Sequence, residues 1–150
     1  MVILRQFFSN PVLISALSAW GLAQFLKIPI YYAISRHWDW DLLRSAGGMP
    51  SSHSALMVSA TLSAGLHVGF DSPTFALAVA ITMIVTYDAA GIRRQAGFQA
   101  EKINKLIAEL FAGEPLSEDI LKEVIGHTPR QVFVGIILGL LVAWVIWLLW

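Results

Sequence analysis

Two short polar motifs hold the residues of this sequence that are best suited to chemistry, and each stands directly before a long apolar run. They are Gly48-Met49-Pro50-Ser51-Ser52-His53 and Gly126-His127-Thr128-Pro129-Arg130-Gln131. In the first motif, glycine allows a sharp turn, and the serines open a helix whose first N–H groups have no internal partner. Such a helix start attracts anions, and a histidine beside a bound anion can supply a proton. The motifs therefore indicate phosphate chemistry.

The second histidine strengthens this interpretation. Taken alone, Pro50 to His53 could be a proline, a serine cap and a surface histidine. His127 also precedes a helix start, because Thr128 and Gln131 have the spacing of a capping box. Pro129 then occupies the first helical position, where its missing N–H costs nothing. We expect both histidines to lie at helix entrances on one face of the protein.

The composition is that of a membrane protein. The chain of 150 residues is 57% hydrophobic and only 13% charged, and its mean hydropathy is +0.67, which exceeds the values of ordinary soluble domains. A net charge of +0 provides no general basic field for nucleic acid. The absence of cysteine excludes disulfides and thiolate metal sites. We expect a single domain over residues 1–150.

The apolar segments predict an all-α integral membrane bundle with about four transmembrane helices. These segments run from Pro11 to about Ile34, from Ser52 to about Phe70, from Pro73 to about Ala90 and from Pro129 to Trp150. Asn10, Ser72 and Thr128 each precede a proline, which is the pattern of an N-cap followed by proline at the first helical position. The first segment has no small-residue cleavage pattern, so it is expected to be a membrane helix rather than a signal peptide.

A polar insertion separates the third and fourth apolar segments, from Arg93 to Thr128. Within it, apolar residues recur at helical spacing, which predicts an amphipathic helix on the bundle surface or in the headgroup layer. These residues are Ile103, Leu106, Ile107, Leu110 and Phe111. Ser117 is expected to open a second short helix that Gly126 closes.

The distribution of basic residues predicts which face is cytoplasmic. Four spans place the loop after the first segment and the long insertion on one side, together with most of the Lys and Arg residues. These are Arg36, Arg44, Arg93, Arg94, Lys102, Lys105, Lys122 and Arg130, against Arg5 on the other side. By the positive-inside rule, this face and its polar motifs are cytoplasmic.

The same topology brings further charged residues towards the two histidines. Lys27 lies near the end of the first segment, Arg93 and Arg94 open the insertion, and Asp88 lies in the otherwise apolar third segment. An intramembrane aspartate is costly and therefore a candidate functional residue, although a salt bridge to Arg93 or Arg94 would also explain it. Lys27 could instead extend to the headgroups.

The motifs resemble those of the divergent branch of the type 2 phosphatidic acid phosphatase superfamily, over essentially the whole chain. Pro50-Ser51-Ser52-His53 and Gly126-His127-Thr128-Pro129-Arg130-Gln131-Val132 carry the resemblance. It implies that His127 is a nucleophile that forms a phosphohistidine and that His53 protonates the leaving group. It also implies that Lys27, the serines and the arginine pair hold the phosphate, without a metal or other cofactor. These phosphate-binding residues are Lys27, Ser51, Ser52, Arg93 and Arg94.

The sequence departs from the superfamily pattern at the position four residues after the nucleophile. An aspartate is expected there, and this chain has Gln131. The capping box explains a glutamine at this position. The carboxylate that would orient His127 could instead be Asp88 or Glu101. In addition, the long insertion separates Arg93 and Arg94 from His127.

The resulting hypothesis is an integral membrane phosphatase that hydrolyses a lipid or prenyl phosphate or diphosphate. Its partners would be this substrate and membrane lipids, and a second protomer could bury the polar face of so small a chain. One alternative is a non-catalytic protein that binds phospholipid headgroups or assembles with membrane proteins. Another is a small transporter that uses Asp88 and Lys27 as intramembrane charges. A metal site of His53, His127 and Asp88 lacks a ligand spacing such as His-x-x-x-His.

Overall fold

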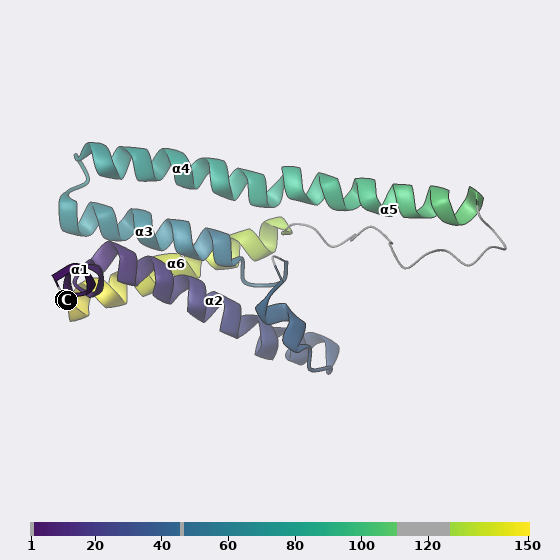
Figure 1. Ribbon diagram of the computed structural model, residues 1–150, viewed down its shortest axis with the longest axis horizontal. Helices are drawn as coiled ribbons and strands as arrows, with labels where there is room; N and C mark the ends of the chain where they lie inside the picture. Colours follow the sequence, from purple (N-terminus) through teal and green to yellow (C-terminus); the bar gives the residue numbers. More distant parts are fainter. Residues whose placement is uncertain (1, 46, 111–126) are drawn as a thin grey trace.

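The protein is all-helical over the residues that the computed structural model describes, which are 2–45, 47–110 and 127–150. Figure 1 shows α2, α3, α4 and α6 running alongside one another, with α5 extending beyond them. The helices are α1 (Val2–Phe8), α2 (Pro11–Ser35), the 3-10 helix η1 (Trp40–Leu43), α3 (Ser52–Val68), α4 (Pro73–Ala90), α5 (Ile92–Leu110) and α6 (Pro129–Leu149). The predicted helical membrane bundle is confirmed.

The helix starts lie where the capping residues predict them. The Asn10 side chain accepts a hydrogen bond from the Leu13 N–H at 3.1 Å, and the Ser72 hydroxyl accepts one from the Phe75 N–H at 3.2 Å. Thr128 and the residue three positions later form both halves of a capping box. These local bonds satisfy N–H groups that the helix itself leaves unpaired, which fixes the first residue of α2, α4 and α6.

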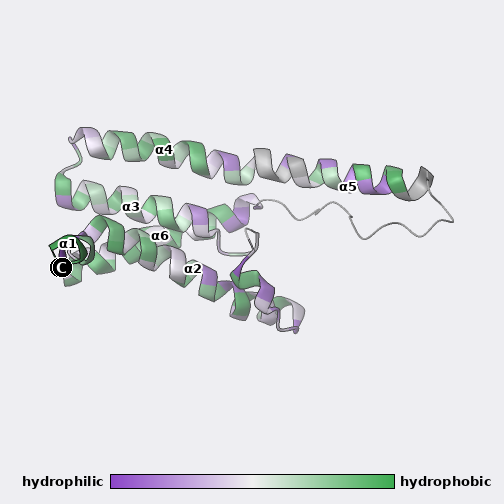
Figure 2. Cartoon of the chain, viewed as in Figure 1, coloured by the Kyte–Doolittle hydropathy of each residue, from purple (hydrophilic) through white to green (hydrophobic). Residues whose placement is uncertain are grey.

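The structure contains three helices that are long and apolar enough to span a bilayer, namely α2, α4 and α6, among the described residues. Figure 2 shows their predominantly hydrophobic colouring beside the mixed colouring of α5. The fourth expected span, α3, has 17 residues and would extend about 25 Å at 1.5 Å per residue, somewhat less than a typical hydrocarbon core. The count of four spans therefore stays a prediction.

Helix α3 is the centre of the bundle, since it packs against α2, α4 and α6. Its buried residues are almost all small, and they are Ser52, Ser54, Ala55, Val58, Ser59, Ser63, Ala64 and Gly65. Small side chains allow helix backbones to approach closely, which is the main source of packing energy between helices in a membrane. The serines that shorten the apolar run of α3 are thus the residues that let its neighbours pack tightly.

The closest approach to α3 comes from two glycines of α6, one helical turn apart. A Cβ at Gly135 would fall on the carbonyl oxygen of Ser51, and a Cβ at Gly139 would lie 2.6 Å from that of Ala55. Real Cβ atoms do not approach an oxygen so closely. Gly135 and Gly139 therefore allow α6 to lie directly on the backbone of α3, in the manner of a small-xxx-small membrane contact.

The predicted amphipathic helix is confirmed as α5, Ile92–Leu110. Figure 1 shows that α5 continues roughly in line with α4 and projects past the end of the bundle. The expected short helix between Ser117 and Gly126 lies outside the described residues. The short helix α1 precedes the first predicted segment, and Figure 1 places both α1 and the C-terminus at the end of the bundle opposite to α5.

Replacing Gly139 by alanine is expected to destabilise the bundle. The added methyl group would overlap the Ala55 carbonyl, and such overpacking costs about 1–3 kcal/mol. The matched control is Gly21→Ala, because a Cβ at Gly21 meets nothing within 4 Å. Thermal unfolding of the purified protein in detergent should show a lower Tm for Gly139→Ala and an unchanged or higher Tm for Gly21→Ala. Equal Tm values for the two variants would contradict the proposed close contact.

Candidate active site

The N-termini of α3 and α6 meet at one end of the bundle and bring the two polar motifs together. The Ser51 N–H donates a hydrogen bond to the Gln131 carbonyl at 3.0 Å, and the His127 N–H donates one to the Ala89 carbonyl of α4 at 3.0 Å. The rings of His53 and His127 then lie with their centroids 6.0 Å apart and their planes at 63°. Residues that are far apart in the sequence thus form one polar site.

His127 is the most enclosed histidine of this site, with only 1% of its surface exposed. Its Nδ1 atom lies 3.3 Å from the side-chain oxygen of Gln131, whereas Nε2 is buried without a hydrogen-bond partner. Burial lowers the pKa of His127 to about 4, and the nearby charges of Lys27 and His53 act in the same direction. The ring is therefore neutral at pH 7 and carries one nitrogen lone pair.

Lys27 is also buried, with an exposed fraction of 1%. Its Nζ donates a hydrogen bond to the Ser45 carbonyl at 2.7 Å, and three residues earlier on α2 the Gln24 amide donates to the Leu43 carbonyl at 2.9 Å. Two side chains of α2 therefore hold the loop that leads to the first polar motif. Lys27 does not extend to the headgroups, and it places a positive charge beside His127.

Gly48 is the residue at which the loop between η1 and α3 approaches the site. This residue has a φ of 88°, a left-handed conformation that favours glycine. A Cβ at Gly48 would lie 3.5 Å from the Lys27 side chain, and the Gly48 backbone also lies near the His127 ring. The glycine expected to allow a sharp turn thus also lies against the Lys27 side chain and near the His127 ring.

The two serines of the first motif have different surroundings. The Ser51 hydroxyl caps α3, since it accepts hydrogen bonds from the Ser54 N–H at 3.3 Å and from the Ser54 hydroxyl at 3.0 Å. Ser52 is buried at the first position of α3, where a backbone N–H has no carbonyl partner within its helix. The Ser51 hydroxyl is therefore engaged in capping α3, whereas the backbone N–H at Ser52 is left without a partner inside the helix.

The acidic candidates lie elsewhere. Asp88 directly precedes Ala89, whose carbonyl accepts the His127 N–H. The Asp88 side chain, however, lines a separate hollow of about 430 Å³ with Met83, Ile84 and Tyr87 of α4. Glu101 forms a salt bridge with Lys105 at 2.7 Å on α5. Within residues 2–45, 47–110 and 127–150, the His127 ring has Gln131 as its side-chain hydrogen-bond partner.

The remaining candidates are placed only in part. Arg93 and Arg94 belong to the first turn of α5, directly after the end of α4, and their side chains lie outside the described part of the structure. In the part of the chain that is described, no group of three or more His, Asp or Glu residues is arranged to hold a metal ion. His53, His127 and Asp88 accordingly do not form a metal site there.

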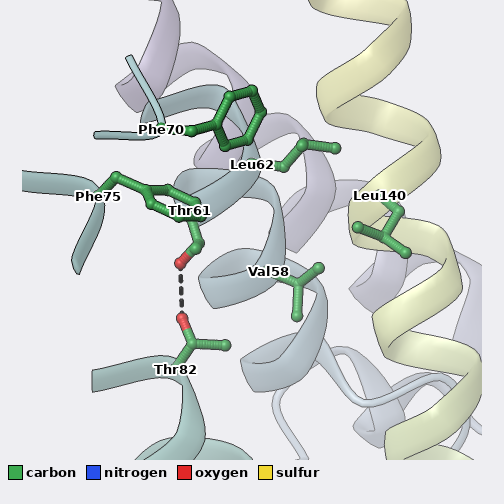
Figure 3. A pocket seen from close by; sticks show the side chains of 7 residues that line it. All are labelled: Val58, Thr61, Leu62, Phe70, Phe75, Thr82 and Leu140. Atoms are coloured by element: carbon green, nitrogen blue, oxygen red, sulfur yellow. Dashed lines mark hydrogen bonds between the residues drawn. The ribbon is translucent and has the colours of Figure 1, made fainter. Parts of the chain in front are cut away.

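An apolar cleft of about 200 Å³ lies further along α3, between α4 and α6 (Figure 3). The hydroxyls of Thr61 and Thr82 in its wall are 2.7 Å apart and share one hydrogen bond. The hydroxyl that accepts this bond can donate its own hydrogen to a backbone carbonyl, that of Ala78 for Thr61 or that of Met57 for Thr82. The cleft therefore presents hydrocarbon rather than polar groups. Its lining residues are Val58, Thr61, Leu62, Phe70, Phe75, Thr82 and Leu140.

Sequence reasoning missed two contributors to the site, Gln24 and the ring contact of Gln131. Gln24 lies three residues before Lys27, and this spacing puts both polar side chains on one face of an otherwise apolar helix. That pattern could have identified the polar pair, in which Lys27 is buried and Gln24 half-buried. Gln131 stands at the position of the expected aspartate and forms the predicted helix cap, and its side chain in addition contacts the ring of His127.

Comparison with known proteins identifies the family. Residues 8–142 match the divergent PAP2 family. The chain is also 40% identical over 149 residues to the uncharacterized membrane protein YuiD of Bacillus subtilis (strain 168), a match that covers 92% of this chain and 94% of that protein. No solved structure gives a significant match. The chain therefore belongs to the divergent PAP2 family, as its two polar motifs predicted.

The buried neutral His127 should make the fold sensitive to acid. Its pKa is lowered from 6.5 to about 4, so the folded state binds the proton less readily than the unfolded state. The stabilisation is complete above pH 6.5 and is lost as the pH falls towards 4, with a loss of roughly 1–3 kcal/mol. Unfolding in detergent across this range should show a smaller acid-induced decrease of Tm for His127→Asn than for the wild type.

His37→Asn is the control for this measurement, because His37 is exposed in the loop after α2. Its removal takes away a histidine without changing a buried group. If His127→Asn and the wild type lose the same stability between pH 6.5 and pH 4, His127 is not the group responsible.

Proposed function

We propose that this member of the divergent PAP2 family is an integral membrane phosphatase that hydrolyses a lipid or prenyl phosphate or diphosphate through a phosphohistidine. The observation that carries the proposal is the buried, unpartnered Nε2 of His127 at the meeting point of two helix N-termini. His53 lies across from it, with 6.0 Å between ring centroids. A neutral imidazole with a lone pair in an electropositive pocket is suited to attack phosphorus.

In the proposed reaction, Nε2 of His127 forms a bond to phosphorus while the bond from phosphorus to the leaving oxygen breaks. His53 transfers a proton to that oxygen, so the lipid leaves as an alcohol, or as a monophosphate if the substrate is a diphosphate. Water then attacks the phosphohistidine and gives its proton to His53, which releases phosphate and restores both histidines. No metal or external redox partner is needed.

The phosphoryl charge would be stabilised by groups that are fixed in advance. Lys27 is buried beside His127, and the first-turn N–H groups of α3 point along the positive end of its dipole. We assign Arg93 or Arg94 the same role, because the start of α5 follows directly on the segment of α4 that binds His127. Charges held in a low-dielectric site stabilise a phosphoryl transition state effectively.

A lipid substrate is supported by the surroundings of the site. Helices α2, α4 and α6 have the length and composition of membrane spans, so a phosphate bound at the helix entrances would have its tail in hydrocarbon. The apolar cleft along α3 offers room for part of such a chain. The excess of Lys and Arg in the loops of this end favours a cytoplasmic active face.

The second candidate function is a non-catalytic protein that binds phospholipid headgroups or assembles with other membrane proteins. The observation in its favour is that His127 contacts the neutral Gln131 rather than a carboxylate. Vanadate distinguishes the two, since it resembles the phosphoryl transition state. Inhibition of turnover supports the enzyme, whereas binding of vanadate without turnover of any lipid phosphate supports the binding protein.

The phosphatase is tested by replacing each histidine with asparagine and measuring phosphate release from purified protein. The substrates are phosphatidate, lysophosphatidate, phosphatidylglycerol phosphate, and prenyl phosphates and diphosphates, with a chelator present. His127→Asn and His53→Asn should each lower turnover at least roughly 10³-fold, because they remove the nucleophile and the acid.

His67→Asn is the matched control for this assay. His67 lies in the last turn of α3, at the opposite end from the site, and its Nδ1 is paired with the Ser63 carbonyl at 2.9 Å. Its replacement should leave turnover unchanged. Full activity of folded His127→Asn would refute the phosphohistidine route.

A further inference from the structure

Gln131 occupies a position where one side-chain oxygen serves two neighbours. Its Oε1 accepts a hydrogen bond from the Thr128 N–H at 2.9 Å and lies 3.3 Å from Nδ1 of His127. The Gln131 backbone carbonyl in addition accepts the Ser51 N–H at 3.0 Å. One residue in the first turn of α6 thus contacts its own helix start, the start of α3 and the buried histidine.

The contact with Thr128 determines which atom of the amide faces the ring. A backbone N–H can only donate, so the atom that it meets must be the amide oxygen, and an amide oxygen can only accept. A hydrogen bond to His127 therefore requires the hydrogen to be on Nδ1. Because a neutral imidazole has one N–H, Nε2 must then carry the lone pair.

We propose that Gln131 is the positioning residue of His127, holding the ring in the Nδ1–H tautomer and leaving Nε2 as the nucleophilic atom. Gln131 would take over the orienting role of the missing carboxylate without its charge. The assignment of a catalytic benefit rests on the proposed phosphatase function. The tautomer itself does not, because it is argued from the two contacts of the Gln131 side-chain oxygen.

Helix capping alone would accept either glutamine or glutamate at this position. A glutamate would add a negative charge to the pocket in which the proposed phosphate binds. A neutral acceptor fixes the ring without repelling a bound phosphate. The amide is therefore suited to the site as well as to the helix.

The experiment measures the tautomer directly, by long-range proton–nitrogen correlation NMR of protein with ¹⁵N-labelled histidine rings in detergent at pH 7. The His127 signals are those that disappear in His127→Asn. We expect the wild type to show a protonated Nδ1 and an unprotonated Nε2. Gln131→Glu should keep this pattern, since a carboxylate also only accepts, whereas Gln131→Leu should lose it.

Thr128→Ala is the matched control for helix capping. It removes the hydroxyl that accepts the Gln131 N–H at 3.4 Å but leaves the Gln131 side chain in place, so its ring tautomer should stay that of the wild type. If Thr128→Ala loses the protonated Nδ1 signal as completely as Gln131→Leu does, the contribution of Gln131 is helix capping and not positioning of the ring. A wild-type ring protonated on Nε2, directed at the Gly48 backbone, would overturn the proposal outright.

Turnover is measured on the same variants so that the two proposals can fail separately. If the wild type hydrolyses a lipid phosphate, Gln131→Leu should lower turnover by roughly 10²- to 10⁴-fold, the range expected when a catalytic histidine has the wrong tautomer. An inactive wild type with the expected tautomer would refute the phosphatase and leave the positioning role standing. Active wild type with unchanged turnover in Gln131→Leu would refute the catalytic benefit.

Discussion

The close contact between α3 and α6 is the constraint on which the rest of the structure depends. Gly135 and Gly139 let the α6 backbone lie against that of α3, and the small residues of α3 make this approach possible along the helix. Because both helices begin at the same end, the contact also places two positive helix ends together. Lys27 is buried beside them. The packing that stabilises the bundle thus creates a site of positive electrostatic potential. A bound anion would neutralise part of this positive charge.

The same enclosure explains the state of His127. A charged imidazole would be costly in a buried site that already contains the Lys27 ammonium, so the ring gives up its proton and its pKa falls to about 4. A neutral ring is the form that the proposed attack on phosphorus requires. Burial therefore has two effects at this residue, since it lowers the stability of the protein in acid and keeps the ring in its lone-pair form at neutral pH.

The parts of the structure that could be predicted from the sequence depend on local chemistry. Asn10, Ser72 and Thr128 mark helix starts because a cap involves only the next three residues. The burial of Lys27 could not be predicted in the same way, since the Ser45 carbonyl that binds it is 18 positions away. The two motifs likewise meet through a tertiary contact, the hydrogen bond from the Ser51 N–H to the Gln131 carbonyl, and Ala89 of α4 in turn binds the His127 N–H. Local patterns identify the residues of the site, and packing decides their surroundings.

Gln131 shows why a sufficient local explanation can hide a second role. An amide oxygen has two lone pairs, so the cap at Thr128 uses only part of its capacity. In the proposed reaction, attack by Nε2 would make the ring positively charged, and the phosphoryl oxygens would bring compensating negative charge to the same residue. What the ring needs from its neighbour is the correct tautomer and orientation, and a neutral acceptor can supply both.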